Sequence, residues 1–227
     1  LFYLPETKPD NKLNKPKTIL KNPLKQLFTV FKEEKIRKLS LAFFIYFIAF
    51  TGLTNILIFF LQESLNWTTK ASSGTLVVVG VIAIIVQGGL IGPLVKQFGE
   101  MRLTLIGAGF ILIACFLLIT TPKENTTINI YSAVSFLAIG AGLITPTLRA
   151  LISKKLDVNN QGSILSNLQG LQSLGGVLGI AMAGRVYDSF GPKSPFIAGS
   201  IILIFMIYLI AEGKNNNSFN DQKSKVL

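Results

Sequence analysis

The sequence contains no histidine and one cysteine, Cys115, and these two counts exclude several kinds of site. Without histidine the chain cannot form a Ser-His or Cys-His nucleophile pair, or a histidine-bearing zinc site. One cysteine cannot close an internal disulfide or supply a thiolate cluster. We therefore expect no catalytic residues, no metal site and no cofactor.

Charged residues are also scarce, at 15% of 227 residues, whereas soluble domains contain about 25%. They leave six uncharged windows: Leu39–Gln62, Ala71–Val95, Leu103–Pro122, Asn125–Leu148, Val158–Gly184 and Ser194–Ala211. A helix of about 20 residues crosses a hydrocarbon core of about 30 Å. Six such helices buried in a soluble protein of this size would leave too little polar surface. The sequence therefore predicts an all-α membrane protein with a six-helix transmembrane domain over residues 39–212.

Basic residues are distributed unevenly between the two sides of this domain. The segment before the first window, the second and fourth connections and the tail hold 18 of the 22 lysines and arginines. The other side holds Lys70, Lys123, Arg185 and Lys193. Because excess Lys and Arg marks cytoplasmic loops, we expect both termini in the cytoplasm and the domain in the plasma (inner) membrane. The basic residues that give the net charge of +11 then lie mostly at the cytoplasmic surface of the lipid bilayer. This location explains the charge without nucleic acid, which is not an expected partner.

The flanking segments predict a chain that continues a longer protein. Residues 1–8 hold apolar residues ending at Pro5, as at the end of a preceding transmembrane helix. Residues 9–38 are expected to form a cytoplasmic linker, and residues 213–227 a cytoplasmic tail. Five apolar linker residues recur at helical spacing: Leu20, Leu24, Leu27, Phe28 and Phe31. They predict an amphipathic helix on the membrane surface or a helical lead-in to the first span.

A repeat with an offset of 92 residues relates the two halves of the domain. Gly92, Phe98, Gly99 and Gly107 correspond to Gly184, Phe190, Gly191 and Gly199. The offset carries the second span onto the fifth and the third onto the sixth. Because each copy has three spans, an odd number, the second copy must be upside down in the membrane. Two inverted three-helix repeats are typical of secondary transporters.

Three stretches resemble transporters of the major facilitator superfamily. Leu4–Thr7 resembles the end of their sixth helix, and Gly92–Arg102 the cytoplasmic loop motif of their second half. Gly142–Pro146, with residues 161–162 and 169–184, resembles the tenth and eleventh helices of the drug:proton antiporter branch of multidrug and tetracycline exporters. The resemblance implies half of a 6+6 transporter fold, a non-enzymatic role, and an N-terminal six-helix half of the same protein as partner.

The loop motif supplies the candidate gate residues Gly92, Lys96, Gly99 and Arg102. Relative to the family pattern, Lys96 stands in place of Asp, and Gln97 and Glu100 stand in place of Arg. Because these departures change the charges of the loop, we do not expect it to form the network of charged side chains that is usual in the family. Two small-residue pairs, Gly88 with Gly92 and Gly175 with Gly179, predict that the second and fifth spans pack closely.

Polar and aromatic residues inside the windows are the candidates for substrate binding: Tyr46, Phe50, Thr51, Asn55, Gln87, Thr145, Gln169 and Gln172. Hydrogen bonding between helices is the alternative role for each of them. As a set they suit a neutral or amphipathic ligand. Arg149 and Arg185 are expected at opposite helix ends, away from the cavity. No acidic residue lies in a window, so proton coupling would depend on acids in the N-terminal half.

The predicted function is secondary transport, with export of small amphipathic compounds in exchange for protons. The alternatives are uptake of a sugar or other small metabolite, and a membrane remnant that transports nothing. A histidine-dependent intramembrane serine protease is excluded by the composition. A lipid-modifying membrane enzyme would need His, Asp or Lys groups that converge at one interface.

Overall fold

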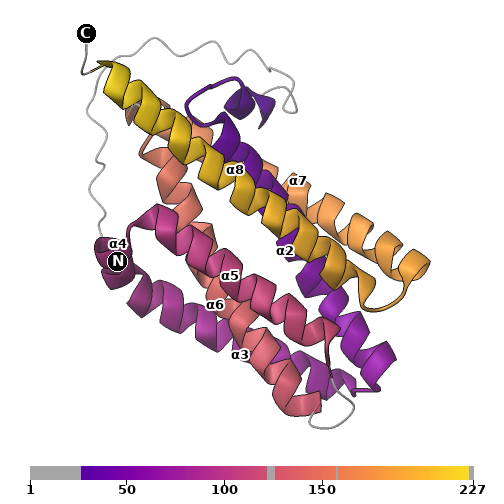
Figure 1. The fold of residues 1–227 in the computed structure, drawn as a ribbon. Helices are drawn as coiled ribbons and strands as arrows, with labels where there is room; N and C mark the ends of the chain where they lie inside the picture. The colour runs from indigo at the N-terminus through magenta and orange to yellow at the C-terminus, as the bar shows by residue number, and fades with distance from the viewer. Residues whose placement is uncertain (1–26, 122–125, 157, 225–227) are drawn as a thin grey trace, which may run out of the picture.

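Each uncharged window forms a long helix in the computed structural model, which describes residues 27–121, 126–156 and 158–224 (Figure 1). The helices are α2 (Arg37–Phe59), α3 (Thr69–Ile85), α4 (Ile91–Phe98), α5 (Glu100–Ile119), α6 (Thr126–Ser153), α7 (Val158–Phe190) and α8 (Ser194–Ser224). Two π-helical turns, η2 (Phe60–Ser64) and η3 (Val86–Leu90), continue α2 and join α3 to α4. Since no strand occurs in these ranges, the predicted all-α class is confirmed.

Five of the helical segments are long and apolar enough to cross a membrane, judged by length and composition. They are Arg37–Ser64, Thr69–Phe98, Glu100–Ile119, Thr126–Ser153 and Ser194–Glu212. The predicted fifth span, α7, has 33 residues but is not among them. Its first half carries many amides and hydroxyls, including Asn167, Gln169 and Gln172, which lower hydropathy without adding charge. The absence of charge therefore located this helix correctly but overstated how apolar it is.

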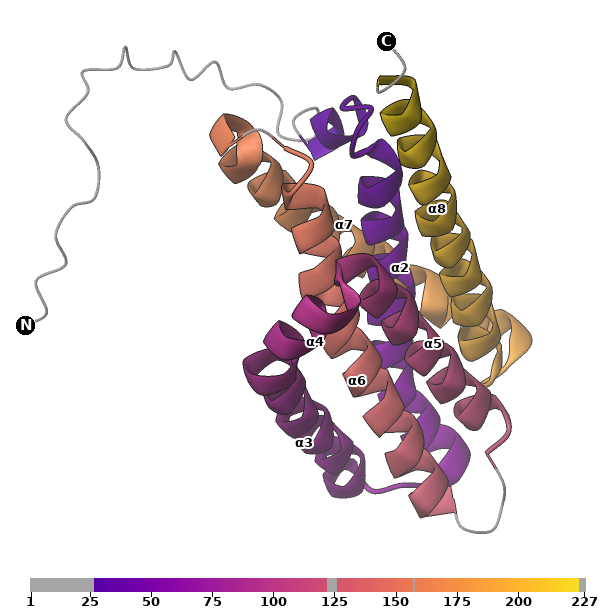
Figure 2. The ribbon, with the colours of Figure 1, turned by 60° about the vertical axis from the view of Figure 1, so that its left-hand side comes forward.

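The helices pair as the predicted repeat requires. In the described bundle α5 packs along α6 and α2 packs along α8, while α6 also contacts α3 and α2 also contacts α7 (Figures 1 and 2). The repeat matches α2 with α6, α3 with α7 and α5 with α8. The contact of α5 with α6 then corresponds to that of α8 with α2, and the contact of α3 with α6 to that of α7 with α2. The contact between α6 and α7 is slight by comparison. The bundle thus consists of two equivalent three-helix units.

Matched glycines behave alike in the two units. Gly99 and Gly191 both have positive φ, +76° and +92°, and each follows the last residue of a helix, α4 or α7. Gly107 packs against Ile144 of α6, and Gly199 packs against Leu53 of α2. These local similarities show that the repeat seen in the sequence is a repeat of structure.

Contacts at the two ends of α2 show that the units run in opposite directions. At its start, the Lys38 ammonium donates to a Glu212 carboxylate oxygen of α8 at 2.6 Å, and Glu212 lines the same groove as Gly99. At its other end, the Tyr187 hydroxyl of α7 donates to Glu63 at 3.0 Å, close to the Gly191 turn. The Gly99 and Gly191 turns therefore lie at opposite ends of the bundle, as inversion requires.

One predicted pair of small residues makes close contacts and the other does not. A Cβ on Gly175 would lie 3.1 Å from the Phe44 carbonyl oxygen, and one on Gly179 would overlap the Ile48 carbonyl. Gly88 and Gly92 have open space instead, so the prediction of a close-packed second span is wrong within this part of the chain. The partner of α7 is α2.

Residues 1–26, and with them the predicted preceding helix and most of the linker, lie outside the described residues. The remaining linker forms a 3₁₀ turn, η1 (Phe28–Phe31), whose Val30 is buried. The Asn167 amide of α7 donates to the Thr29 hydroxyl at 3.2 Å. The described part of the predicted amphipathic helix therefore packs against the bundle.

Candidate functional site

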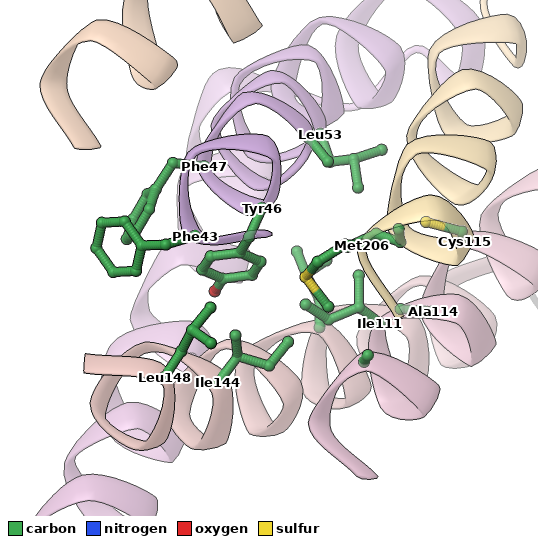
Figure 3. Packing of buried hydrophobic residues seen from close by; sticks show 14 of the residues in the cluster. Phe43, Tyr46, Phe47, Leu53, Ile111, Ala114, Cys115, Ile144, Leu148 and Met206 are labelled. Carbon is green, nitrogen blue, oxygen red and sulfur yellow. The ribbon is translucent and has the colours of Figure 1, made fainter. Parts of the chain in front are cut away.

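Tyr46 of α2 forms the buried centre of the candidate site. Its hydroxyl points toward α6, beside Leu148 (Figure 3), and lies 3.3 Å from the Thr145 hydroxyl. The Phe50 ring, one turn further along α2, stacks on the Tyr46 ring at 5.5 Å between centroids. The two helices are thus joined by a polar contact at this point, with an aromatic surface beside it.

Arg149 extends the site from α6 to α7. It lies one helical turn after Thr145, and its Nη2 donates to Oε1 of Gln169 at 2.8 Å and to Oε1 of Gln172. The guanidinium carbon lies 5.8 Å from the centroid of the Phe43 ring of α2. We call these side chains from three helices the junction cluster: Phe43, Tyr46, Phe50, Thr145, Arg149, Gln169 and Gln172.

The position of Arg149 corrects the expectation that it lies at a helix end, away from the candidate binding residues. α6 continues to Ser153, so Arg149 lies a full turn inside the end of the helix. Its long side chain reaches the side chains of α7. The position of Arg149 in the sequence of α6 does not indicate this contact. Phe43 was also missed, although it lies three residues before Tyr46 and therefore on the same side of α2.

Three predicted site residues lie apart from the junction cluster. The Asn55 side chain is exposed, and its amide donates to the Thr51 carbonyl of its own helix at 2.9 Å. Nine residues separate Asn55 from Tyr46, which turns the two side chains to opposite sides of α2. Thr51 lies beside Gly176 of α7, while Gln87 is exposed in η3, near Gly142 of α6.

The α4–α5 turn holds the predicted gate residues. Gly99 has φ +76° and ψ 157°, a conformation that only glycine adopts readily. Gly92, Lys96 and Arg102 are exposed, and nothing approaches the α-carbon of Gly92 closely. Of the four, only Gly99 has a stereochemical requirement in this structure.

An ion pair beside this turn was not anticipated. Glu100, the first residue of α5, pairs with Lys154, which directly follows α6. Glu100 had been noted only as a departure from the family motif. Its negative charge at the start of α5 and the lysine pair after α6 were the signals that could have suggested the contact.

Comparison with known proteins gives a consistent result. The family model described as Major Facilitator Superfamily matches residues 1–180. The class H tetracycline resistance protein of Pasteurella multocida is 28% identical over 131 residues, or 58% of this chain and 32% of that protein. Major facilitator superfamily domain-containing protein 10 of Mus musculus is 24% identical over 178 residues, or 77% of this chain and 38% of that protein. The class C tetracycline resistance protein of Escherichia coli is 24% identical over 130 residues, or 57% and 32%.

The chain spans well under half the length of each of these relatives, between 32% and 38%. The matched family consists of membrane transporters, which are not enzymes, and the tetracycline resistance relatives represent its drug efflux branch. The all-helical bundle of two inverted three-helix units agrees with both findings. This chain belongs to the major facilitator superfamily and resembles its drug efflux branch.

Proposed function

We propose that this chain is the C-terminal half of a secondary transporter that exports small amphipathic organic compounds in exchange for protons. The observation that carries the proposal is the junction cluster, where aromatic rings and hydrogen-bonding groups of α2, α6 and α7 converge. A few polar groups beside apolar walls are typical of small-molecule sites. The tetracycline resistance relatives support export as the direction.

Exposed amides support a second six-helix half as the partner. Asn55, Gln87 and Gln169 are exposed on α2, η3 and α7, within the segments expected to cross the bilayer. Asn55 donates one hydrogen bond to the Thr51 carbonyl and Gln169 accepts one from Arg149. Leaving the remaining polar groups of an amide unpaired in hydrocarbon is unfavourable by several kcal/mol. These side chains therefore suit a face that meets another protein half across a wet cavity.

The proton carrier is assigned to that partner half. Among the acidic side chains of the described helices, Glu63, Glu100 and Glu212 lie at or near the ends of the segments that could cross a membrane, and Asp188 lies near the end of α7. A carboxylate that carries protons through a membrane protein normally lies within the spans. The N-terminal half must then supply it, and neither half is expected to transport alone.

Dye efflux tests this proposal. Efflux-deficient cells that express both halves should extrude at least one dye from a panel of neutral, anionic and cationic amphipathic dyes, and a protonophore should abolish the extrusion. Cells that express the 227-residue chain alone are the control and should retain the dye. If the cells accumulated a sugar or amino acid and did not extrude dye, the result would contradict export and favour uptake of a small metabolite. Flux through the chain alone would contradict the need for a second half.

A further inference from the structure

We infer that the junction cluster selects organic anions, with Arg149 as the group that binds the acidic function of the substrate. The inference rests on the proposed function, because it names the substrate class of the same site. The expected ligand has a planar acidic group, such as a carboxylate, joined to an aromatic or apolar body. Sequence analysis alone had favoured a neutral or amphipathic ligand, because Arg149 was placed outside the cavity.

Arg149 has no acidic partner among the side chains that the structure describes. The ion pairs found there join Lys38 to Glu212 and Lys154 to Glu100. The oxygens that Arg149 does contact belong to the amides of Gln169 and Gln172, which are neutral. Its Nε is buried and finds no hydrogen-bond partner in the described part of the chain. The positive charge is therefore held in place but not balanced.

An unbalanced cation among transmembrane helices is unfavourable and normally pairs with an anion. A guanidinium presents its N–H groups in a planar fork that matches a carboxylate, and such pairs form stronger hydrogen bonds than neutral groups. Both amide oxygens bond to one terminal nitrogen, Nη2, which fixes the orientation of the fork before any ligand arrives. The bond to Gln169 lies at the exposed side of the cluster, and α6 and α7 contact each other only slightly.

Of the aromatic side chains near Arg149, the half-buried Phe50 is accessible to the apolar body of such a ligand, whereas Phe43 and Tyr46 are fully buried. Phe43 lies against the guanidinium. One turn earlier on α6, about 5.4 Å along the helix axis, Thr145 contacts Tyr46, whose ring stacks on the half-buried Phe50. A cationic group and an aromatic stack about one helical turn apart suit a small aromatic acid. An organic cation would meet the like charge of Arg149 and should be disfavoured.

Two dyes with the same xanthene body and opposite charge test this inference. Fluorescein is an anion when fully ionised, whereas rhodamine 123 is a cation. Their binding to the full-length transporter in lipid nanodiscs, with no proton gradient, is measured by fluorescence anisotropy. We expect the wild type to bind fluorescein more tightly than rhodamine 123. Arg149→Gln should weaken fluorescein binding at least about tenfold, because charge-assisted pairs contribute about 1.5–3 kcal/mol. It should leave rhodamine 123 binding unchanged or tighter.

Matched variants separate charge from structure. Arg149→Lys keeps the charge but loses the planar fork, so fluorescein binding should fall between that of the wild type and Arg149→Gln. Arg185→Gln removes an exposed arginine from the same copy of the sequence repeat, away from the cluster, and should bind both dyes like the wild type. If Arg149→Gln does not fold, the dye preference of the wild type and of Arg149→Lys still decides the matter.

Several outcomes would overturn the inference. They are equal affinity of the wild type for both dyes, absence of fluorescein binding, or fluorescein binding that Arg149→Gln does not alter. Each would mean that Arg149 is balanced by another group, such as a carboxylate of the N-terminal half. Flux into proteoliposomes under a proton gradient is recorded separately. Fluorescein binding that depends on Arg149 but is not followed by flux would contradict the proposed transport and support the anion site. Flux of rhodamine 123 that does not depend on Arg149 would support transport and contradict the anion site.

Discussion

At the residue scale, Gly179 sets the distance between α7 and α2. Its α-carbon lies against the Ile48 carbonyl, so the Gly179→Ala methyl group must push the helices apart. We expect Gly179→Ala to destabilise the protein by about 1–3 kcal/mol, as overpacking does. Thermal unfolding in detergent, followed by circular dichroism, measures the change.

Gly184→Ala on the same helix is the matched control. Apart from its own helix, no described residue lies within 4 Å of the position that its Cβ would occupy. Because alanine favours a helix over glycine by up to about 1 kcal/mol, this variant should be as stable as the wild type or more stable. Equal destabilisation by both substitutions would show that helix propensity, and not the α2–α7 contact, governs this helix.

Gly99 is required by backbone conformation and not by crowding. Its φ of +76° with ψ of 157° belongs to a region that other residues enter at a cost of about 1–3 kcal/mol. Gly99→Ala should lower stability by this amount, and Gly99→Leu should reduce transport while membrane insertion stays intact. The helical, uncrowded Gly92→Ala is the control and should have little effect on stability. Unchanged dye flux in Gly99→Leu would mean that this loop only connects α4 to α5 and has no role as a gate.

At the scale of helices, ion pairs identify which ends lie together. Lys38 at the start of α2 contacts Glu212 of α8, so Lys38→Cys with Glu212→Cys should cross-link rapidly with a short bismaleimide. Glu63→Cys with Glu212→Cys places the cysteines at opposite ends of the bundle and should not react. Cys115 is buried and provides a quiet background. Cross-linking of the second pair would contradict the helix order.

Most helices were predictable from sequence because charge is expensive in a bilayer and its absence therefore marks the spans. α7 was harder to classify, since its amides lower hydropathy without interrupting the uncharged window. Pro146 did not end α6, although it removes a backbone hydrogen bond, and the helix continues to Ser153. Neighbouring helices compensate such a residue, and a sequence does not specify its neighbours.

At the scale of the whole molecule, the orientation in the membrane remains a prediction from basic residues. Lys70 and Lys96 are exposed and lie at the two ends of the α3–α4 segment. Since 18 of 22 basic residues belong to the side of Lys96, that side should face the cytoplasm. Lys70→Cys should react with an impermeant maleimide in intact cells, and Lys96→Cys only after permeabilisation. The reverse pattern would invert the topology.

The sequence by itself determined the helical class, the position of each long helix and the inverted repeat, because hydropathy, charge and matched glycines are properties read along the chain. It also offered Tyr46, Thr145, Gln169 and Gln172 as candidates, because they are polar groups in otherwise apolar windows. Only the tertiary structure decided which of the candidates meet. The Tyr46 and Asn55 side chains point to opposite sides of α2, half a turn apart about the helix axis. The Arg149 guanidinium bonds to side chains of α7, although the backbone of Arg149 belongs to α6. Contacts between helices depend on rotation about the helix axis and on side-chain reach, and neither follows from distance along the sequence.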